Sequence, residues 1–110
     1  MLRAGGGTIV FSGASASVKG YAQSAPFAMG KFALRGLAQS MARELVPQGI
    51  HVAHVVIDGG IQSQASPVPA ESSDSLLDPA AIAATSLHLI EQPRSAWTWE
   101  VEVRPWLERF

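Results

Sequence analysis

Two short apolar, β-branched runs flank a long segment with helical periodicity, and this order constrains the fold more than any other feature. The first run is Thr8–Phe11 and the second is Ile50–Ile57, which Asp58-Gly59-Gly60 ends. Continuous apolar runs of this length are typical of strands buried on both faces of a sheet. A strand, a helix and a strand joined by short connections build a parallel sheet with a right-handed crossover.

The segment between the runs predicts one long helix, residues 24–45. Ser24 suits the position before the first helical residue, and Pro26 suits the first turn. Apolar side chains at steps of three and four predict the buried stripe: Leu34, Leu37, Met41 and Leu45. Long polar side chains at steps of four predict the solvent-facing stripe: Lys31, Arg35, Gln39 and Arg43.

The remaining sequence predicts one more helix and one more strand. Asp78-Pro79 starts a helix that ends near Glu91, and the alternation of residues 97–104 is typical of a strand. Residues 62–77 have weak pattern and predict a mobile loop. The fold expected is therefore α/β, with three mainly parallel strands and flanking helices in a single domain spanning residues 1–110, since two cores would each be too small.

Composition argues against several classes of function. The chain has no cysteine, which excludes disulfides and Cys-based metal sites. His51 and His54 lie three apart on a strand, so they point to opposite faces and cannot chelate one metal; we expect no metal site. A pI near 6.3 argues against nucleic acid as a partner. The first residues do not form a signal peptide and no apolar stretch spans a bilayer, so we expect a cytoplasmic protein without membrane contact.

Two stretches, GGTIVFSGASAS and FAMGKFALRGLAQSMARELVPQGIHVAHVVIDGGI, resemble the C-terminal half of a short-chain dehydrogenase/reductase. The resemblance covers nearly the whole chain. It implies part of a doubly wound, Rossmann-like sheet from which the N-terminal dinucleotide-binding half is missing. It also implies NAD or NADP as cofactor, and hydride transfer to or from a small-molecule carbonyl or alcohol.

Members of this family use a Ser, a Tyr and a Lys, with the last two in a Tyr-x-x-x-Lys spacing. Lys31 occupies the Lys position, where the resemblance implies catalysis and cofactor binding, but Phe27 and Ala14 occupy the expected Tyr and Ser positions. A loop shifted by one residue would present Ser15 instead. A phenyl ring has no ionisable proton, so the resemblance implies impaired catalysis. We expect Phe27 to pack on the sheet.

After the second strand the family has a Pro-Gly turn, an apolar residue and a Thr that meet the cofactor. Here Asp58 replaces the Pro, and Gly59, Ile61 and Ser63 occupy the remaining positions. The resemblance therefore implies that these three residues bind the cofactor. A turn that only reverses the chain is the alternative.

Two further interpretations remain open. The chain could be a non-catalytic oligomerisation or interaction module derived from the family, forming a homo-oligomer through helix 24–45 and strand 97–104 or pairing with a larger family subunit. It could also be a remnant without a selected activity. Position 27 discriminates: a Tyr favours an enzyme, whereas the Phe present favours the interaction module.

Overall fold

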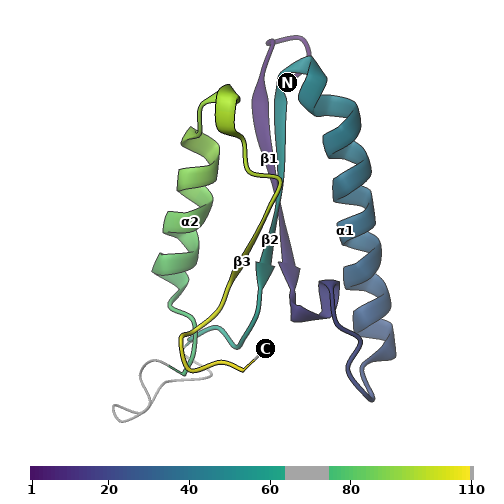
Figure 1. Cartoon of the computed structure of the whole chain (residues 1–110), viewed down its shortest axis with the longest axis vertical. Coiled ribbons are helices and arrows are strands. Elements are labelled where there is room, and N and C mark those ends of the chain that lie inside the picture. The colour runs from purple at the N-terminus through teal and green to yellow at the C-terminus, as the bar shows by residue number, and fades with distance from the viewer. Residues whose placement is uncertain (64–74, 110) are drawn as a thin grey trace.

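The computed structural model describes residues 1–63 and 75–109, and its described part is a three-layer α/β arrangement. In chain order the main elements are β1 (Gly7–Ala14), α1 (Ala25–Leu45), β2 (Ile50–Ile57), α2 (Pro79–Glu91) and β3 (Glu100–Val103). Short 3-10 turns precede or follow them: η1 (Ser15–Ser17), η2 (Val46–Gln48) and η4 (Arg94–Ala96). Helix α1 covers one face of the sheet and α2 covers the other (Figure 1).

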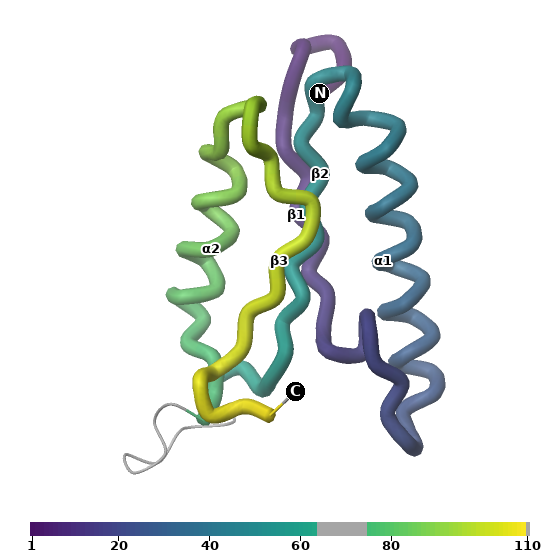
Figure 2. The backbone as a smooth tube through the Cα atoms, viewed as in Figure 1, coloured from purple at the N-terminus to yellow at the C-terminus, as the bar shows by residue number. Residues whose placement is uncertain are grey.

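The sheet confirms the expected parallel, Rossmann-like topology. Its strand order is β1-β2-β3, and both pairs are parallel. The β1–β2 register runs from Gly7 opposite Ile50 to Ala14 opposite Ile57. All three strands therefore end at the same edge of the sheet, which is the lower edge in the backbone trace of Figure 2. Loops after parallel strands meet at such an edge, which is where open α/β sheets bind ligands.

The strand bounds agree with the sequence prediction for β2 and differ for its neighbours. Strand β1 continues beyond Phe11 because Ser12, Gly13 and Ala14 keep pairing with β2. Strand β3 starts at Glu100 rather than at residue 97; just before it, the Trp99 carbonyl oxygen already accepts a hydrogen bond from the His54 main-chain N–H at 2.8 Å. The central strand β2 is buried along nearly its whole length, whereas β1 is mostly half-buried.

The main hydrophobic core lies between the sheet and α2. Its fully buried members are Ala53, Val55 and Leu89, with partly buried side chains packed around them: Val10, Ile57, Val101 and Val103. Burial of a leucine of this kind contributes about 1.5–3 kcal/mol. Because Val101 and Val103 of β3 belong to this core, packing against Leu89 of α2 and Val55 of β2 helps to hold β3 beside β2.

Helix α1 faces the sheet with only part of the stripe that the spacing predicts: Leu34, Met41 and Leu45 are half-buried. Ala28 and Ala38 are buried against the sheet, while Leu37 is 52% exposed. The charged ends of Lys31 and Arg35 reach acceptors on the sheet, although both residues remain partly exposed. Small side chains let the helix come close, and long cationic side chains reach across the remaining gap. The predicted solvent-facing stripe is therefore wrong for these two cations.

The helix starts follow their sequence signals in part. The Asp78 carboxylate accepts a hydrogen bond from the Ala80 main-chain N–H at 2.9 Å, so it caps α2 as predicted. Ser24 occupies the position before α1, but its side chain makes no capping hydrogen bond. Of the predicted loop 62–77, residues 64–74 lie outside the described part; Leu77 is buried and forms a parallel bridge with Ile61. Within residues 1–63 and 75–109, none of the helices has the length and apolar character needed to cross a bilayer.

Candidate functional site

Lys31 lies at the edge of the sheet where the strands end. Its ammonium donates a hydrogen bond to the main-chain oxygen of Ser12 at 3.2 Å. The ammonium is 6.0 Å from the centroid of the Phe27 ring, one helical turn earlier. Residues four apart share a helix face, and the structure brings this pair together as the Tyr-x-x-x-Lys spacing requires.

Phe27 does not pack on the sheet. Its side chain is 55% exposed, because the adjacent Ala28 takes the inward position on this turn of α1. The expectation that Phe27 is a core residue is therefore wrong. An aromatic ring stands beside Lys31 at the site edge, but without a hydroxyl it cannot donate or accept a proton.

The loop that carries the candidate serine is held from within. Ala14 ends β1, and its main-chain N–H donates to the buried Ser17 hydroxyl oxygen at 3.0 Å. Ser15 begins η1 and is half-buried; its carbonyl oxygen accepts from the N–H groups of Val18 and Lys19. Lys31 bonds to the main chain of Ser12, within β1. Ser15 follows directly after β1, at the same edge of the sheet.

The turn after β2 requires a glycine at position 59. Gly59 has a φ of +142°, and a Cβ atom added there would lie 2.9 Å from Cδ of Pro105. A Cβ atom on Gly60 would lie 2.8 Å from a methyl group of Leu76. Ile61 is 44% exposed. The turn thus presents main chain and one apolar side chain at the site edge, and Ser63 is exposed beyond it.

Asp58 anchors this turn, a role that the sequence interpretation missed. Its side chain is buried, and its carboxylate accepts a hydrogen bond from Arg104 Nε at 3.2 Å, with Lys19 Nζ at 3.9 Å. Its main-chain N–H donates to Val103 at 2.8 Å. Asp58 therefore joins the turn to the end of β3 and to the loop after β1. The sequence signal for this role was the position of Asp58, an acidic residue directly after the buried apolar strand.

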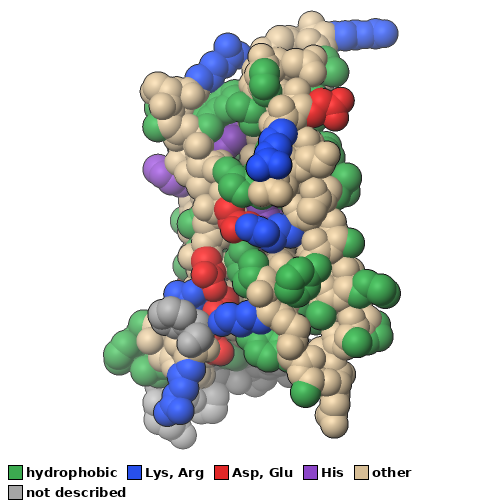
Figure 3. Space-filling model, turned by 45° about the vertical axis from the view of Figure 1, so that its right-hand side comes forward, with side chains coloured by type: hydrophobic (Ala, Val, Ile, Leu, Met, Phe, Trp, Pro, Cys, Tyr) green, Lys and Arg blue, Asp and Glu red, His purple; other side chains and the backbone are tan. Residues whose placement is uncertain are grey.

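A second polar group, Arg35–Glu100–His54, crosses between α1 and the sheet. The guanidinium of Arg35 donates two hydrogen bonds to the Glu100 carboxylate, at 2.6 and 3.1 Å. Nδ1 of the buried His54 lies 3.0 Å from the same carboxylate. The Arg35 hydrogen bond, followed by that of His54, lowers the pKa of Glu100 against the effect of burial. Figure 3 shows acidic and basic side chains gathered next to one another on this side of the molecule.

The other strand histidine faces different neighbours. The His51 ring stacks on Trp97 with centroids 4.7 Å apart, and its Nε2 lies 2.8 Å from the Thr98 carbonyl oxygen. Within residues 1–63 and 75–109, no three His, Asp or Glu side chains converge as metal ligands would.

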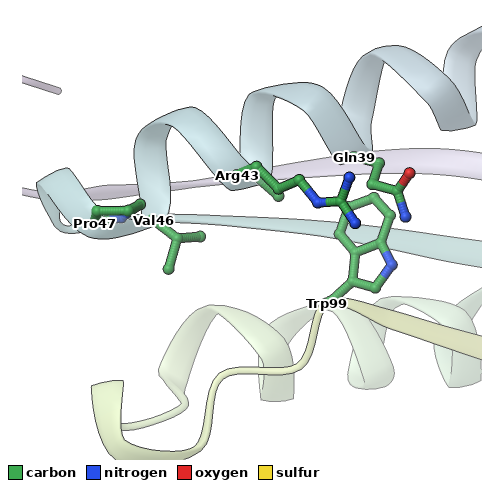
Figure 4. A pocket seen from close by; sticks show the side chains of 6 residues that line it. Gln39, Arg43, Val46, Pro47 and Trp99 are labelled. Carbon is green, nitrogen blue, oxygen red and sulfur yellow. The ribbon is translucent and has the colours of Figure 1, made fainter.

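A groove of about 370 Å³ lies at the other end of α1 from Lys31. Its wall is mostly apolar, and Figure 4 shows the Gln39 and Arg43 side chains beside the Trp99 ring. The groove is lined by Gln39, Ala42, Arg43, Val46, Pro47 and Trp99. It contains none of the residues that the sequence indicated for chemistry.

The described residues fit one end of a nicotinamide dinucleotide. Lys31 offers an ammonium that suits the nicotinamide ribose, and the Gly59–Ile61 turn follows β2 at the same edge of the sheet, with the exposed Ile61 side chain beside it. A pyrophosphate needs a Gly-rich turn that opens a helix. Gly5-Gly6-Gly7 leads into β1, and neither α1 nor α2 starts from such a turn. The pyrophosphate end therefore finds no cradle in residues 1–63 and 75–109.

Comparison with known families identifies the chain. The family model described as short chain dehydrogenase matches residues 1–69. The chain belongs to the short-chain dehydrogenase family. A search of curated proteins gives no match.

Solved structures agree with this assignment. A short-chain dehydrogenase from Rhodopseudomonas palustris is 47% identical, with a TM-score of 0.77; the match covers 96% of this chain and 42% of that one. A metagenomic short-chain oxidoreductase in complex with NADP is 27% identical, with a TM-score of 0.74 and coverage of 98% and 42%. An alcohol dehydrogenase from the archaeon Thermococcus sibiricus, complexed with 5-hydroxy-NADP, shares the fold at 18% identity and a TM-score of 0.79, with coverage of 98% and 45%. The chain thus spans less than half the length of these structures.

Proposed function

We propose that this chain supplies the C-terminal, nicotinamide-facing part of an NAD(P)-dependent oxidoreductase that acts on a carbonyl or alcohol, and that its catalysis is impaired. The observation that carries the proposal is the pairing of Lys31 with the position of Phe27 at the edge where the strands end. The NADP complex of the metagenomic relative supports a nicotinamide dinucleotide as the cofactor.

The chemistry follows from what each residue is able to do. The bound cofactor would supply the hydride, while Lys31 would hold the nicotinamide ribose and favour an ionised group next to it. Gly59, Ile61 and Ser63 would line the nicotinamide. General acid–base catalysis typically contributes about 10²–10⁴-fold to a rate. Because Phe27 has no exchangeable proton, this contribution is lost, and Ser15 alone would polarise the substrate oxygen.

The proposal also requires the other half of the fold. Strand β1 stands at one side of the described sheet, and its apolar residues Ile9, Val10 and Phe11 are only half-buried. Parallel sheets of this class are covered on both faces and bind the pyrophosphate at a neighbouring strand–helix turn. A preceding dinucleotide-binding half, in the same polypeptide or a partner, would complete both the sheet and the cofactor site.

A chimera tests this function. The part of the Rhodopseudomonas palustris relative that lies outside the matched segment would be fused to this chain. We expect the fusion to bind NADH or NADPH and to transfer hydride slowly, and Phe27→Tyr to raise the rate by about 10²-fold or more. Lys31→Ala should abolish the gain. A folded fusion that binds neither cofactor would refute the proposal.

One observation favours the alternative of a non-catalytic oligomerisation module. Lys31 and Arg35 are the only charged residues between Ala25 and Ala42, and both turn toward the sheet. The outer face of α1 between Ala25 and Ala42 therefore carries no charge, yet exposes Met29 by 72% and Phe32 by 47%. Hydrophobic side chains are exposed on the α1 side of the molecule in Figure 3. Exposed apolar faces of this kind mark protein–protein contacts.

Light scattering after size exclusion discriminates the module from a monomer. If α1 pairs with a second copy, the wild-type chain should have at least twice the mass of its 11.6 kDa monomer, and Phe32→Glu should reduce it to one copy. Leu107→Glu, at an exposed apolar residue outside α1, provides a control with the same change of charge. A wild-type monomer over the accessible concentration range would contradict self-association through α1.

A further inference from the structure

The imidazole of His54 is buried against the strand that leads into the serine loop. A Cβ atom added to Gly13 would lie 2.2 Å from Nε2 of His54 and 2.7 Å from the Ser17 hydroxyl oxygen. Both residues are fully buried. The ring edge and the hydroxyl therefore occupy the space beside Gly13, and only glycine leaves room for them.

The contacts of His54 fix where its proton resides. An ionised carboxylate only accepts hydrogen bonds, and Glu100 remains ionised because Arg35 donates to both of its oxygens. Nδ1 of His54, 3.0 Å from Glu100 Oε2, must therefore carry the hydrogen. In the neutral ring Nε2 is then an acceptor, and it is one of two buried side-chain nitrogens without a partner in the described residues.

The Ser17 hydroxyl lies beside Gly13 together with that nitrogen, although the two do not form a hydrogen bond in the structure. Its oxygen already accepts the Ala14 N–H, so its own proton remains to be donated. Leaving a buried acceptor unsatisfied costs about 1–3 kcal/mol, which favours a rotation of the Ser17 side chain toward that nitrogen. Ser17 in turn holds Ala14, the residue that precedes Ser15.

We propose that His54 is a positioning residue: Glu100 holds it with the proton on Nδ1, and its Nε2 accepts a hydrogen bond from the Ser17 hydroxyl, which fixes the loop carrying Ser15. The hydrogen bonds of this series involve only residues of this polypeptide. A catalytic use of the positioned Ser15, in contrast, rests on the proposed function. Arg35 lies one helical turn after Lys31. The series of hydrogen bonds from Arg35 through Glu100 and His54 would therefore connect helix α1 to the loop that carries Ser15.

Nitrogen NMR of the full chain, labelled with ¹⁵N, tests the proposal, and His51 is an internal control. Nε2 of His51 faces a carbonyl oxygen, so that ring must carry its proton on Nε2. We expect the two rings to carry their protons on opposite nitrogens: on Nδ1 in His54, which faces a carboxylate, and on Nε2 in His51, which faces a carbonyl oxygen. A His54 ring protonated on Nε2, alone or together with Nδ1, would overturn the proposal.

Two variants test the consequence for the loop. Ser17→Ala should shift the Nε2 resonance of His54, leave His51 unchanged, and increase amide exchange at Val18 and Lys19, whose N–H groups bond to Ser15. Ser17→Thr, which keeps the hydroxyl, should restore the Nε2 resonance. An unchanged Nε2 resonance in Ser17→Ala refutes the contact. None of these measurements needs a cofactor, so failure of the chimera to bind NADH or NADPH leaves them independent.

Discussion

The ammonium of Lys31 is bound to the main-chain oxygen of Ser12 at 3.2 Å, so the helix and the end of β1 are fixed to each other at the candidate site. In the family resemblance the same Lys serves a phenol and a ribose. The Phe27 ring centroid lies 6.0 Å from this ammonium, and under the proposed function the ring would stand where the resemblance places the phenol.

A tyrosine at position 27 should have its pKa lowered by the positive charge of Lys31. In Phe27→Tyr the new phenol lies near the ammonium, and its pKa should fall about 0.5–1 unit below the usual value near 10. Ultraviolet titration should resolve it from Tyr21, the one native tyrosine. Adding Lys31→Met should return the pKa of residue 27 to the usual range; an unshifted phenol in the single variant would show that Lys31 does not act on this position.

Acid should destabilise the chain through Glu100. Its pKa is lowered in the folded state by Arg35, so its contribution is present above the ordinary value of 4.5 and is lost as the pH falls through the lower folded value. Urea denaturation between pH 7 and pH 3 measures this. Glu100→Gln should cost about 1–2 kcal/mol at pH 7 and flatten the acid dependence. Glu102→Gln, on the same strand, should keep the wild-type slope; equal slopes in all three proteins would contradict the assignment.

The turn glycine should not tolerate a side chain. Gly59→Ala combines an unfavourable φ of +142° with a contact of 2.9 Å to Pro105, and should destabilise the chain by about 1–3 kcal/mol. Gly30→Ala, in α1 with open space around it, should instead stabilise by about 0.5–1 kcal/mol. Thermal unfolding compares the two. An equally mild effect at both positions would mean that the turn adapts and is not a fixed part of the site.

The fold followed from the sequence where local pattern and tertiary role coincide. Strand β2 is apolar throughout because it is central, so its bounds, Ile50–Ile57, were predicted correctly. Asp78 and Pro79 marked the start of α2 for the same reason, since a cap and a first-turn proline act locally.

The candidate site was less predictable because its polar groups act across elements. Spacing placed Arg35 on a solvent-facing stripe, but its partner is Glu100, which lies far along the chain. Asp58 likewise depends on Arg104, from another strand end. Periodicity cannot distinguish an exposed cation from one that reaches a distant carboxylate. Exposure of Phe27 escaped prediction because the neighbouring Ala28 fills the inward position.

Hydride transfer by the isolated chain is the most direct test of the account. The chain would be mixed with NADH or NADPH and a panel of carbonyl compounds, and loss of the reduced nicotinamide absorbance followed. We predict no turnover, because Phe27 supplies no proton and residues 1–63 and 75–109 offer no pyrophosphate cradle. Turnover by the wild-type chain that Lys31→Ala abolishes would contradict this account.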